Sequence, residues 1–144
     1  MHSLTLTKDF DVSVAELFNA WKSPKILQQW LAPGQTDVPT MDIDFKEGGA
    51  FRITIMQSDD CDFNIAGGIY KTIEEDKKIV MSWQWEGSEH QTELELTFTH
   101  TGANSSELIL VHREFPEEDI RDNHKSGWIG CLNHLTTCLR QKAA

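Results

Sequence analysis

Three histidines and a tyrosine are the side chains best placed for acid–base chemistry in this sequence. His124 falls on the apolar face of an expected C-terminal helix, His100 and His112 share the alternation of apolar strands, and Tyr70 lies in a strand expected over residues 63–73. A histidine with a pKa near neutrality could act as a general acid or base. However, no nucleophile stands beside a base at a diagnostic spacing, and a hydrogen-bonded core histidine is the more common case. We therefore expect a binding protein rather than an enzyme, and we name no catalytic residue.

Two cysteines and a histidine near the C-terminus have a spacing that could bind a metal. Cys131, His134 and Cys138 stand three and four residues apart, so one helical face could offer three soft ligands to zinc. A structural zinc site needs a fourth ligand, and the sequence has no Cys-x-x-Cys pair. A free cysteine beside an apolar stripe also behaves as a small hydrophobic residue. We expect no metal and no cofactor, and we regard Cys61, in a polar turn, as the most reactive cysteine.

Aromatic side chains fall on the inward faces of several expected elements. Directed at the space between a sheet and a long helix, they would line a pocket for an apolar or aromatic molecule, oriented by a few polar groups. Large rings also fill a protein interior well, so the same residues could simply form the core. Both interpretations stay open. The candidate ligand-binding residues are Trp21, Trp30, Phe51, Tyr70, Trp83, Trp85, Phe98, His112, His124, Trp128 and Cys131, with Arg52 added if its hairpin is shifted.

Length and charge limit the classes of protein that this chain can belong to. Its 144 residues suit one domain, which we place at residues 1–144. A net charge of -10 without a basic stripe disfavours a nucleic-acid partner. The odd cysteine count, the absence of a signal-peptide pattern and the lack of a long apolar run favour a cytoplasmic protein without a membrane span.

The elements that must position the candidate residues begin with a strand and two short helices. Leucines 4 and 6 alternate with threonines in a first strand. Ser13 and Glu16 then form a capping box, which predicts the start of a helix. Ser23 and Pro24 follow as the N-cap and first residue of a second short helix.

From Met41 onward the hydrophobic period changes to two, which predicts strands. The apolar alternation covers residues 41–45, 51–55, 63–73, 79–85, 94–98 and 108–112. Gly67 and Gly68 lie inside the third of these strands, where glycine is costly unless a bulge or a close backbone approach requires it. We therefore expect a bend at that point.

The last thirty residues predict a long amphipathic helix. Its start lies between Glu117 and Asp122, and its apolar face consists of Ile120, His124, Trp128, Cys131, Leu135 and Leu139. A meander of about six strands with one polar face must curl around an apolar partner. The expected fold is therefore α+β: a curved antiparallel sheet of about six to seven strands wrapped on the C-terminal helix, with two short helices after the first strand.

Several stretches in this order resemble the Hsp90 ATPase activator homologue family, within the START/Bet v 1-like superfamily of helix-grip proteins. They are the segment from Val14 to Trp30, the Glu47-Gly48-Gly49 turn before Phe51, Gly68-x-Tyr70, Trp83-x-Trp85, and His124 followed by Gly127-Trp128, Leu132 and Leu135. The resemblance implies a sheet gripping a C-terminal helix, with a cavity between them. Because the superfamily includes lipid carriers, cyclase-type enzymes and chaperone regulators, it implies little about the chemistry.

Three functions remain open from the sequence. The first is a domain that encloses a small hydrophobic or aromatic molecule between the sheet and the helix. The second, implied by the resemblance, is an interaction module that regulates an Hsp90-type chaperone. The third is a cyclase or hydratase that uses His124 or His112. The edge strands of a curved sheet could also pair between copies, so the sequence does not decide between a monomer and a homodimer.

Overall fold

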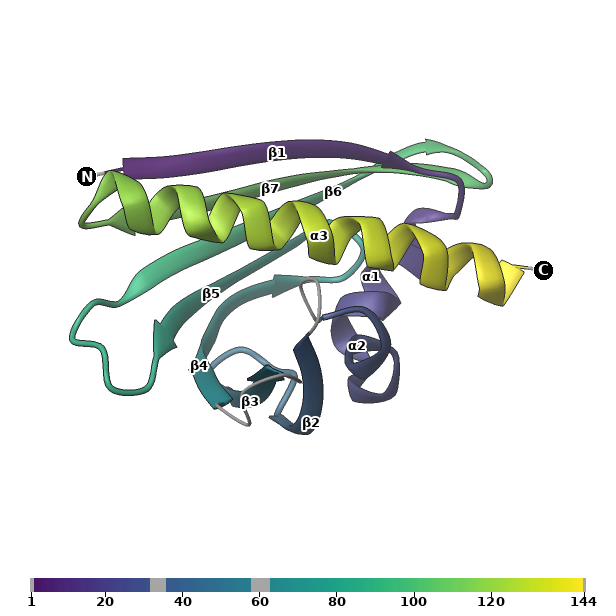
Figure 1. Ribbon diagram of the computed structural model, residues 1–144. Helices are drawn as coiled ribbons and strands as arrows, with labels where there is room; N and C mark the ends of the chain where they lie inside the picture. Colours follow the sequence, from purple (N-terminus) through teal and green to yellow (C-terminus); the bar gives the residue numbers. More distant parts are fainter. Residues whose placement is uncertain (1, 32–35, 58–62, 144) are drawn as a thin grey trace.

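The computed structural model describes residues 2–31, 36–57 and 63–143, which contain seven strands and three helices (Figure 1). In chain order these are β1 (His2–Phe10), α1 (Val14–Lys22), α2 (Pro24–Trp30), β2 (Thr36–Ile43), β3 (Ala50–Gln57), β4 (Phe63–Glu74), β5 (Lys78–Trp85), β6 (Thr92–Gly102), β7 (Ser105–Phe115) and α3 (Glu118–Ala143). The predicted order of one strand, two short helices, six strands and a long helix is confirmed.

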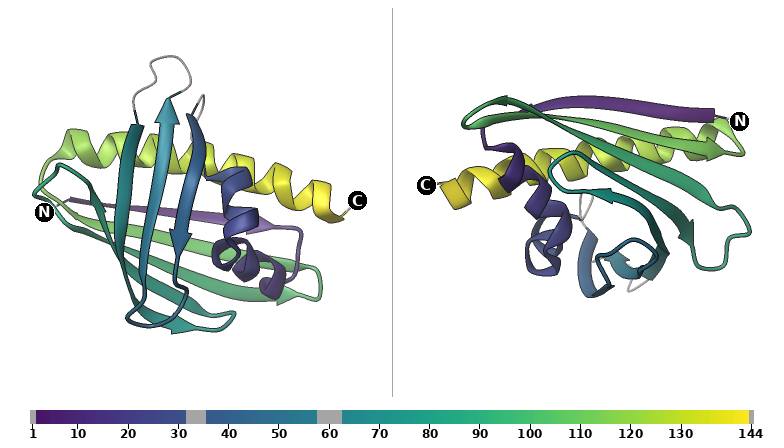
Figure 2. Two further views of the ribbon diagram at one scale, coloured as in Figure 1. Left: turned by 90° about the horizontal axis from the view of Figure 1, so that it is seen from below. Right: turned by 180° about the vertical axis from the view of Figure 1, so that it is seen from behind.

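All the described strands belong to one antiparallel sheet with the order β1-β7-β6-β5-β4-β3-β2. Strands β2 to β7 form a meander, and β1 pairs with β7, so the first strand of the chain lies beside the last. The sheet is strongly curved: β1 and β7 run along α3, while β2, β3 and β4 curl away beneath it (Figures 1 and 2). The helix therefore lies on the concave side of the sheet, as predicted.

Local capping sets the two short helices at one end of the curved sheet. The Ser13 hydroxyl accepts a hydrogen bond from the amide of Glu16 at 3.2 Å, which confirms the predicted start of α1. Ser23 caps α2 in the same way through the amide of Ile26, and Pro24 occupies the first turn. Ser23, which is also the C-cap of α1, therefore sets the turn between α1 and α2.

The two faces of β6 show how the sheet separates the core from solvent. Leu94, Leu96 and Phe98 are buried, as the alternation predicted. On the opposite face, Arg113 of β7 contacts the carboxylates of Glu93 and Glu95 at 2.8 and 2.7 Å. The inner face therefore supplies apolar surface to the core, and the outer face is crossed by ion pairs.

The close backbone approach predicted in β4 occurs at Gly68. A Cβ atom there would collide with the carbonyl oxygen of Ser82 on β5, whose hydroxyl also accepts a hydrogen bond from the amide of Ile69 at 2.9 Å. The irregularity in the β4–β5 pairing lies further along, between Tyr70 and Thr72. Of the two predicted reasons for a glycine in this strand, close backbone approach therefore applies at Gly68, and the pairing irregularity follows it along the strand.

Helix α3 begins at Glu118, inside the predicted range, and buries one face against the rest of the protein. Its buried residues are Trp128, Cys131, Leu132, Leu135, Cys138 and Leu139, and Ile120 packs at the edge of the same core. In the described part of the chain, no helix is long and apolar enough to cross a membrane.

Candidate functional site

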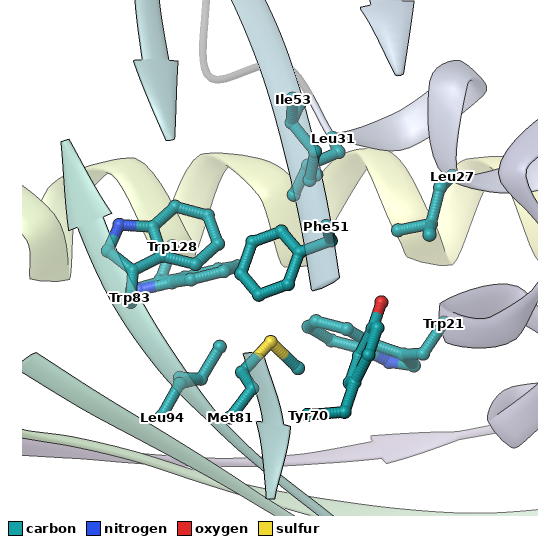
Figure 3. Close-up of a pocket in the computed structure, with 10 residues that line it drawn as sticks. All are labelled: Trp21, Leu27, Leu31, Phe51, Ile53, Tyr70, Met81, Trp83, Leu94 and Trp128. Carbon is teal, nitrogen blue, oxygen red and sulfur yellow. The ribbon is translucent and has the colours of Figure 1, made fainter. Parts of the chain in front are cut away.

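A small apolar cavity lies where α1, α2, four strands and α3 meet (Figure 3). Its volume is about 20 Å³, which is enough for one water molecule. The lining residues come from α1 and α2 on one side, from strands β3 to β6 on another, and from α3. They are Trp21, Leu27, Leu31, Phe51, Ile53, Tyr70, Met81, Trp83, Leu94 and Trp128.

Five aromatic rings form a continuous chain around this cavity. Neighbouring ring centroids are 5.4 Å apart for Tyr70 and Phe51, 5.9 Å for Phe51 and Trp83, 5.5 Å for Trp83 and Trp128, and 6.0 Å for Trp128 and Trp21. These are the separations at which aromatic pairs interact favourably. Each ring comes from a different element, so the cavity exists only when α1, β3, β4, β5 and α3 are all in place.

Two of the predicted site residues lie behind this wall rather than in it. Trp30 is fully buried, and its indole N–H donates to the carbonyl oxygen of Ala20 at 3.0 Å. Its ring contacts that of Trp21 with centroids 4.6 Å apart. Phe98 contacts Phe18 of α1 instead, at 5.2 Å. These residues support the cavity from outside by fixing α1.

His124 and Trp85 form a hydrogen-bonded pair next to the cavity. The indole N–H of Trp85 donates to His124 Nε2 at 2.8 Å, while His124 Nδ1 lies 2.8 Å from the carbonyl oxygen of Ile120. A carbonyl can only accept, so the proton of the neutral ring is on Nδ1. Burial lowers the pKa of His124, although the hydrogen bond to Ile120 partly opposes this shift. The imidazole is therefore neutral and both nitrogens are engaged.

His112 is fully buried and has a partner on each side. The Thr92 hydroxyl donates to the carbonyl oxygen of Trp83 at 2.8 Å, so it must accept from His112 Nε2, which lies 2.7 Å away. His112 Nδ1 is then the acceptor for the indole N–H of Trp128 at 3.1 Å. Burial, and secondarily the charge of a protonated His124, lowers the pKa of His112 to about 3.

Of the polar candidates, Tyr70 lines the cavity, whereas the histidines and Arg52 do not. His100 is exposed on β6, and Arg52 is exposed on β3, where its guanidinium contacts the carboxylate of Glu86 at 2.8 Å. His100 lies beyond the buried stretch of its strand, so its alternation with apolar residues was misleading. Arg52 keeps the outward position of the unshifted hairpin, paired with Gly67 of β4.

The three potential zinc ligands of α3 do not converge on one site, because only the two cysteines face the core. Cys131 and Cys138 are buried, whereas His134 is exposed. Burial raises the pKa of the Cys131 thiol to about 12, so it stays protonated. These properties suit two small core residues and a surface histidine. Cys61, the predicted reactive cysteine, lies outside the described residues.

Sequence reasoning missed one polar residue and several apolar ones. Thr92 bonds both His112 and the backbone of Trp83, and the only signal for it was its alternation with the buried leucines of β6. The apolar lining residues not proposed as part of a site are Leu27, Leu31, Ile53, Met81 and Leu94. The inward faces of the strands and of the short helix were predictable for all of them except Leu31, but their shared cavity was not.

Two indole donors in the wall are left without a partner. The Nε1 atoms of Trp21 and Trp83 are buried and make no hydrogen bond to the residues that the structure describes. Both side chains line the cavity, Trp21 from α1 and Trp83 from β5 (Figure 3). Burial also raises the pKa of Tyr70 in the same wall, so its hydroxyl keeps its proton. The polar groups of this otherwise apolar wall are thus all neutral.

Comparison with protein families matches the chain to a family model described as activator of Hsp90 ATPase homolog 1-like protein. The match covers residues 11–140, which is most of the chain. A comparison with curated proteins found no significant match.

Solved structures share the fold over nearly the whole chain. The AHSA1 protein from Silicibacter pomeroyi has a TM-score of 0.86 and 24% sequence identity, covering 98% of this chain and 99% of that one. A protein from Chromobacterium violaceum has a TM-score of 0.85 and 17% identity, covering 95% and 96%. CalU16 from Micromonospora echinospora has a TM-score of 0.72 and 23% identity, covering 94% and 74%. At these identities the likeness establishes the arrangement of the sheet and helices.

Proposed function

The chain belongs to the family of activator of Hsp90 ATPase homolog 1-like proteins, and from this premise we propose that it is a ligand-binding domain. The ligand is a small apolar or aromatic molecule enclosed between the sheet and α3. The observation that carries this proposal is the cavity between α1, the sheet and α3, whose wall is a chain of five aromatic rings. Small-molecule sites in proteins are typically concave and mostly apolar, with a few polar groups that orient the ligand.

The size of the cavity specifies how binding would occur. Ligand pockets usually have volumes of roughly 300 Å³ or more, whereas this one measures about 20 Å³. A ligand must therefore displace side chains of the wall. Met81 is the most adaptable of them because its unbranched thioether can repack, and Leu27 and Leu31 belong to the short helix α2 and the residue that follows it. The free energy of this rearrangement reduces the observed affinity.

Titration with the neutral fluorescent dye N-phenyl-1-naphthylamine tests this proposal. We expect saturable binding of one dye per chain, and displacement of the dye by a lipid extract. Leu94→Phe, which fills the cavity from β6, should weaken binding at least about tenfold, because an overfilled wall cannot accept the dye. Ile69→Phe is the matched control, because Ile69 is 49% exposed on the sheet and does not line the cavity. Absence of binding, or equal binding by wild type and Leu94→Phe, would refute the proposal.

A second candidate is regulation of an Hsp90-type chaperone, which is favoured by the description of the family. Ile129 of α3 is 45% exposed and offers apolar surface for such a contact. In an ATPase assay with a purified Hsp90, stimulation by wild type and loss of stimulation in Ile129→Asp would support this role. No change in ATPase rate at saturating protein would exclude it.

We do not propose the cyclase or hydratase function. Every ring nitrogen of His112 and His124 already has a hydrogen-bond partner. Burial also lowers the pKa of both residues, to about 3 for His112, which disfavours the protonated form that a general acid requires.

A further inference from the structure

Trp85 and His124 make the only hydrogen bond between α3 and β5 in the part of the chain that the structure describes. The indole N–H of Trp85 donates to Nε2 of His124 at 2.8 Å. The other side-chain hydrogen bonds that α3 makes to described residues outside the helix lead to β1, β7 and α2. This one pair therefore fastens the helix to the middle strand of the sheet.

The pair forms an outer layer over two rings of the cavity wall. Trp85 and His124 are half-buried, whereas Trp83 and Trp128 are buried. The ring centroid of Trp85 lies 5.7 Å from that of Trp83, which lies 5.5 Å from that of Trp128. Trp85 also lines an open surface hollow of about 400 Å³, so its ring has space to turn outward. Trp85 and His124 thus lie between solvent and this part of the wall.

The chemistry of the two rings makes their hydrogen bond depend on one proton. An indole N–H can only donate, and a neutral imidazole accepts only through the nitrogen that carries no proton. Nδ1 of His124 donates to the carbonyl oxygen of Ile120, so Nε2 is the nitrogen that accepts from Trp85. A second proton on His124 goes to Nε2 and places two N–H donors face to face. The hydrogen bond is therefore incompatible with a protonated His124.

The strands around His124 offer no negative charge to a protonated imidazole. β7 contributes His112 and Phe115, whose ring centroids lie 5.3 and 4.9 Å from that of His124. A charge on His112 would repel a charge on His124. β5 contributes Trp85, and the carboxylate of the following residue, Glu86, belongs to an exposed ion pair on the outer face of the sheet.

Helix α3 does not provide a counter-ion either. Arg121, one turn before His124, contacts the carboxylates of Glu118 and Asp122. The exposed charged residues of this part of the helix are Glu118, Asp119, Asp122 and Lys125. Among the residues that the structure describes, His124 makes no ion pair. A protonated His124 therefore gains nothing by staying in its present position, and water is its best partner.

We propose that the hydrogen bond between Trp85 and His124 is an acid-sensitive latch, which releases Trp85 from α3 when Nε2 of His124 takes a proton and so opens a route to the cavity. The role in ligand entry rests on the proposed function, whereas the release does not. Burial lowers the pKa of His124 while the latch is closed. The released imidazole lies in water, where its pKa is about 6.5. Each pH unit below that value therefore favours the released form by up to about tenfold.

An acid titration of wild type by proton–nitrogen correlation spectroscopy tests the release. The nitrogen signal of His124 Nε2 reports when this atom takes its proton. Over the same pH interval, the indole signal of Trp85 should move upfield, and its proton should exchange faster with water. The indole signals of Trp30 and Trp128 should stay in place, because Trp30 donates to a backbone carbonyl and the acceptor of Trp128, His112, is fully buried.

The rate at which N-phenyl-1-naphthylamine associates tests the route to the cavity. Between about pH 7.5 and pH 5.5, the association rate constant of wild type in stopped-flow fluorescence should rise about three- to tenfold. Trp85→Phe lacks the donor of the latch, so it should associate faster than wild type already at about pH 7.5. His100→Gln is the matched control, because His100 is exposed on β6, and it should keep the wild-type response to pH.

Two results of the titration would refute the latch. The first is a Trp85 signal that stays in place after His124 has taken its proton, because the indole would then hold the imidazolium through its ring face. The second is the simultaneous loss of all five indole signals, because acid would then unfold the protein as a whole.

The dye separates the latch from the proposed function. If the dye does not bind at any pH, the proposed function fails, and the spectra still decide whether Trp85 is released. If the dye binds at a rate that does not change with pH although Trp85 is released, ligand entry past Trp85 is refuted. Should Trp85→Phe not fold, the spectra and rates of wild type and His100→Gln decide.

Discussion

The indole nitrogen of Trp128 on α3 donates to Nδ1 of His112 on β7 across 3.1 Å. The same imidazole donates through Nε2 to Thr92 on β6, and the Thr92 hydroxyl donates to the backbone of Trp83 on β5. One buried path of hydrogen bonds thus joins the helix to three neighbouring strands. Because all its members are satisfied, this path fixes how α3 lies on the sheet.

Removing the Thr92 hydroxyl tests this path. Thr92→Val keeps the shape of the side chain but leaves His112 Nε2 and the Trp83 carbonyl oxygen without their partner. We expect the free energy of unfolding to fall by about 1–3 kcal/mol, measured by urea denaturation. Thr97→Val, on the outer face of the same strand, should change it by less than about 0.5 kcal/mol. Equal effects of the two substitutions would contradict the assigned role of Thr92.

Stability should fall in mild acid because two histidines are buried in the neutral form. Burial lowers the pKa of His112 from 6.5 to about 3 and also lowers that of His124. Below about pH 6.5 the unfolded chain therefore binds protons that the folded chain does not. The contribution of the two neutral histidines to the free energy of unfolding is therefore fully present above their pKa in the unfolded chain. It is lost as the pH falls below that value. Each histidine contributes at most about 1.4 kcal/mol per pH unit.

Urea denaturation between about pH 7.5 and pH 5 measures this slope, in a range above the ordinary pKa of the carboxylates. His124→Gln removes one buried titrating group and should make the slope shallower. His100→Gln, at an exposed position, should leave the slope unchanged. A slope that is unaltered in His124→Gln would show that folding does not lower the pKa of His124.

Gly68→Ala should disturb the pairing of β4 with β5. Its Cβ would meet the backbone oxygen of Ser82, which cannot move without distorting β5. We expect destabilisation of about 2–4 kcal/mol in urea unfolding. Gly67→Ala is the comparison, because its Cβ would lie 3.1 Å from the Phe51 carbonyl oxygen, a tight contact that a small shift relieves. Similar stabilities for the two variants would contradict the close approach at Gly68.

Cys131 should resist alkylation in the native protein. Burial raises the pKa of its thiol to about 12, so almost no reactive thiolate exists at about pH 8. Iodoacetamide labelling followed by peptide mass spectrometry should find Cys131 unmodified in buffer and modified in urea. Rapid native labelling would mean that α3 leaves the sheet frequently.

Much of the fold was predictable because its signals are local. The Ser13 cap, the alternation from Leu94 to Phe98 and the spacing from Ile120 to Leu139 depend on neighbours within a few residues. Such patterns identify which face of an element is apolar, and burying those faces leaves few arrangements. The helix on the concave side of the sheet follows from them.

The site was only partly predictable because its contacts join distant parts of the chain. The sequence identified the aromatic residues that face inward, but not that Tyr70, Phe51, Trp83, Trp128 and Trp21 follow one another around a cavity. It placed His100 and His112 on equal terms, although one is exposed and the other fully buried. Alternation gives the face of a strand, whereas burial also depends on what covers that position.

The sequence by itself therefore determined the elements, their apolar faces and the curved sheet around the last helix. The reason is that the hydrophobic period is a local pattern, which depends only on residues a few positions apart. Only the tertiary structure decided which indoles have acceptors, which histidines are neutral and how much space the rings leave. Those properties depend on side chains that approach to about 3 Å from elements far apart in the sequence, and on close packing in which a few cubic ångströms separate a filled core from a cavity.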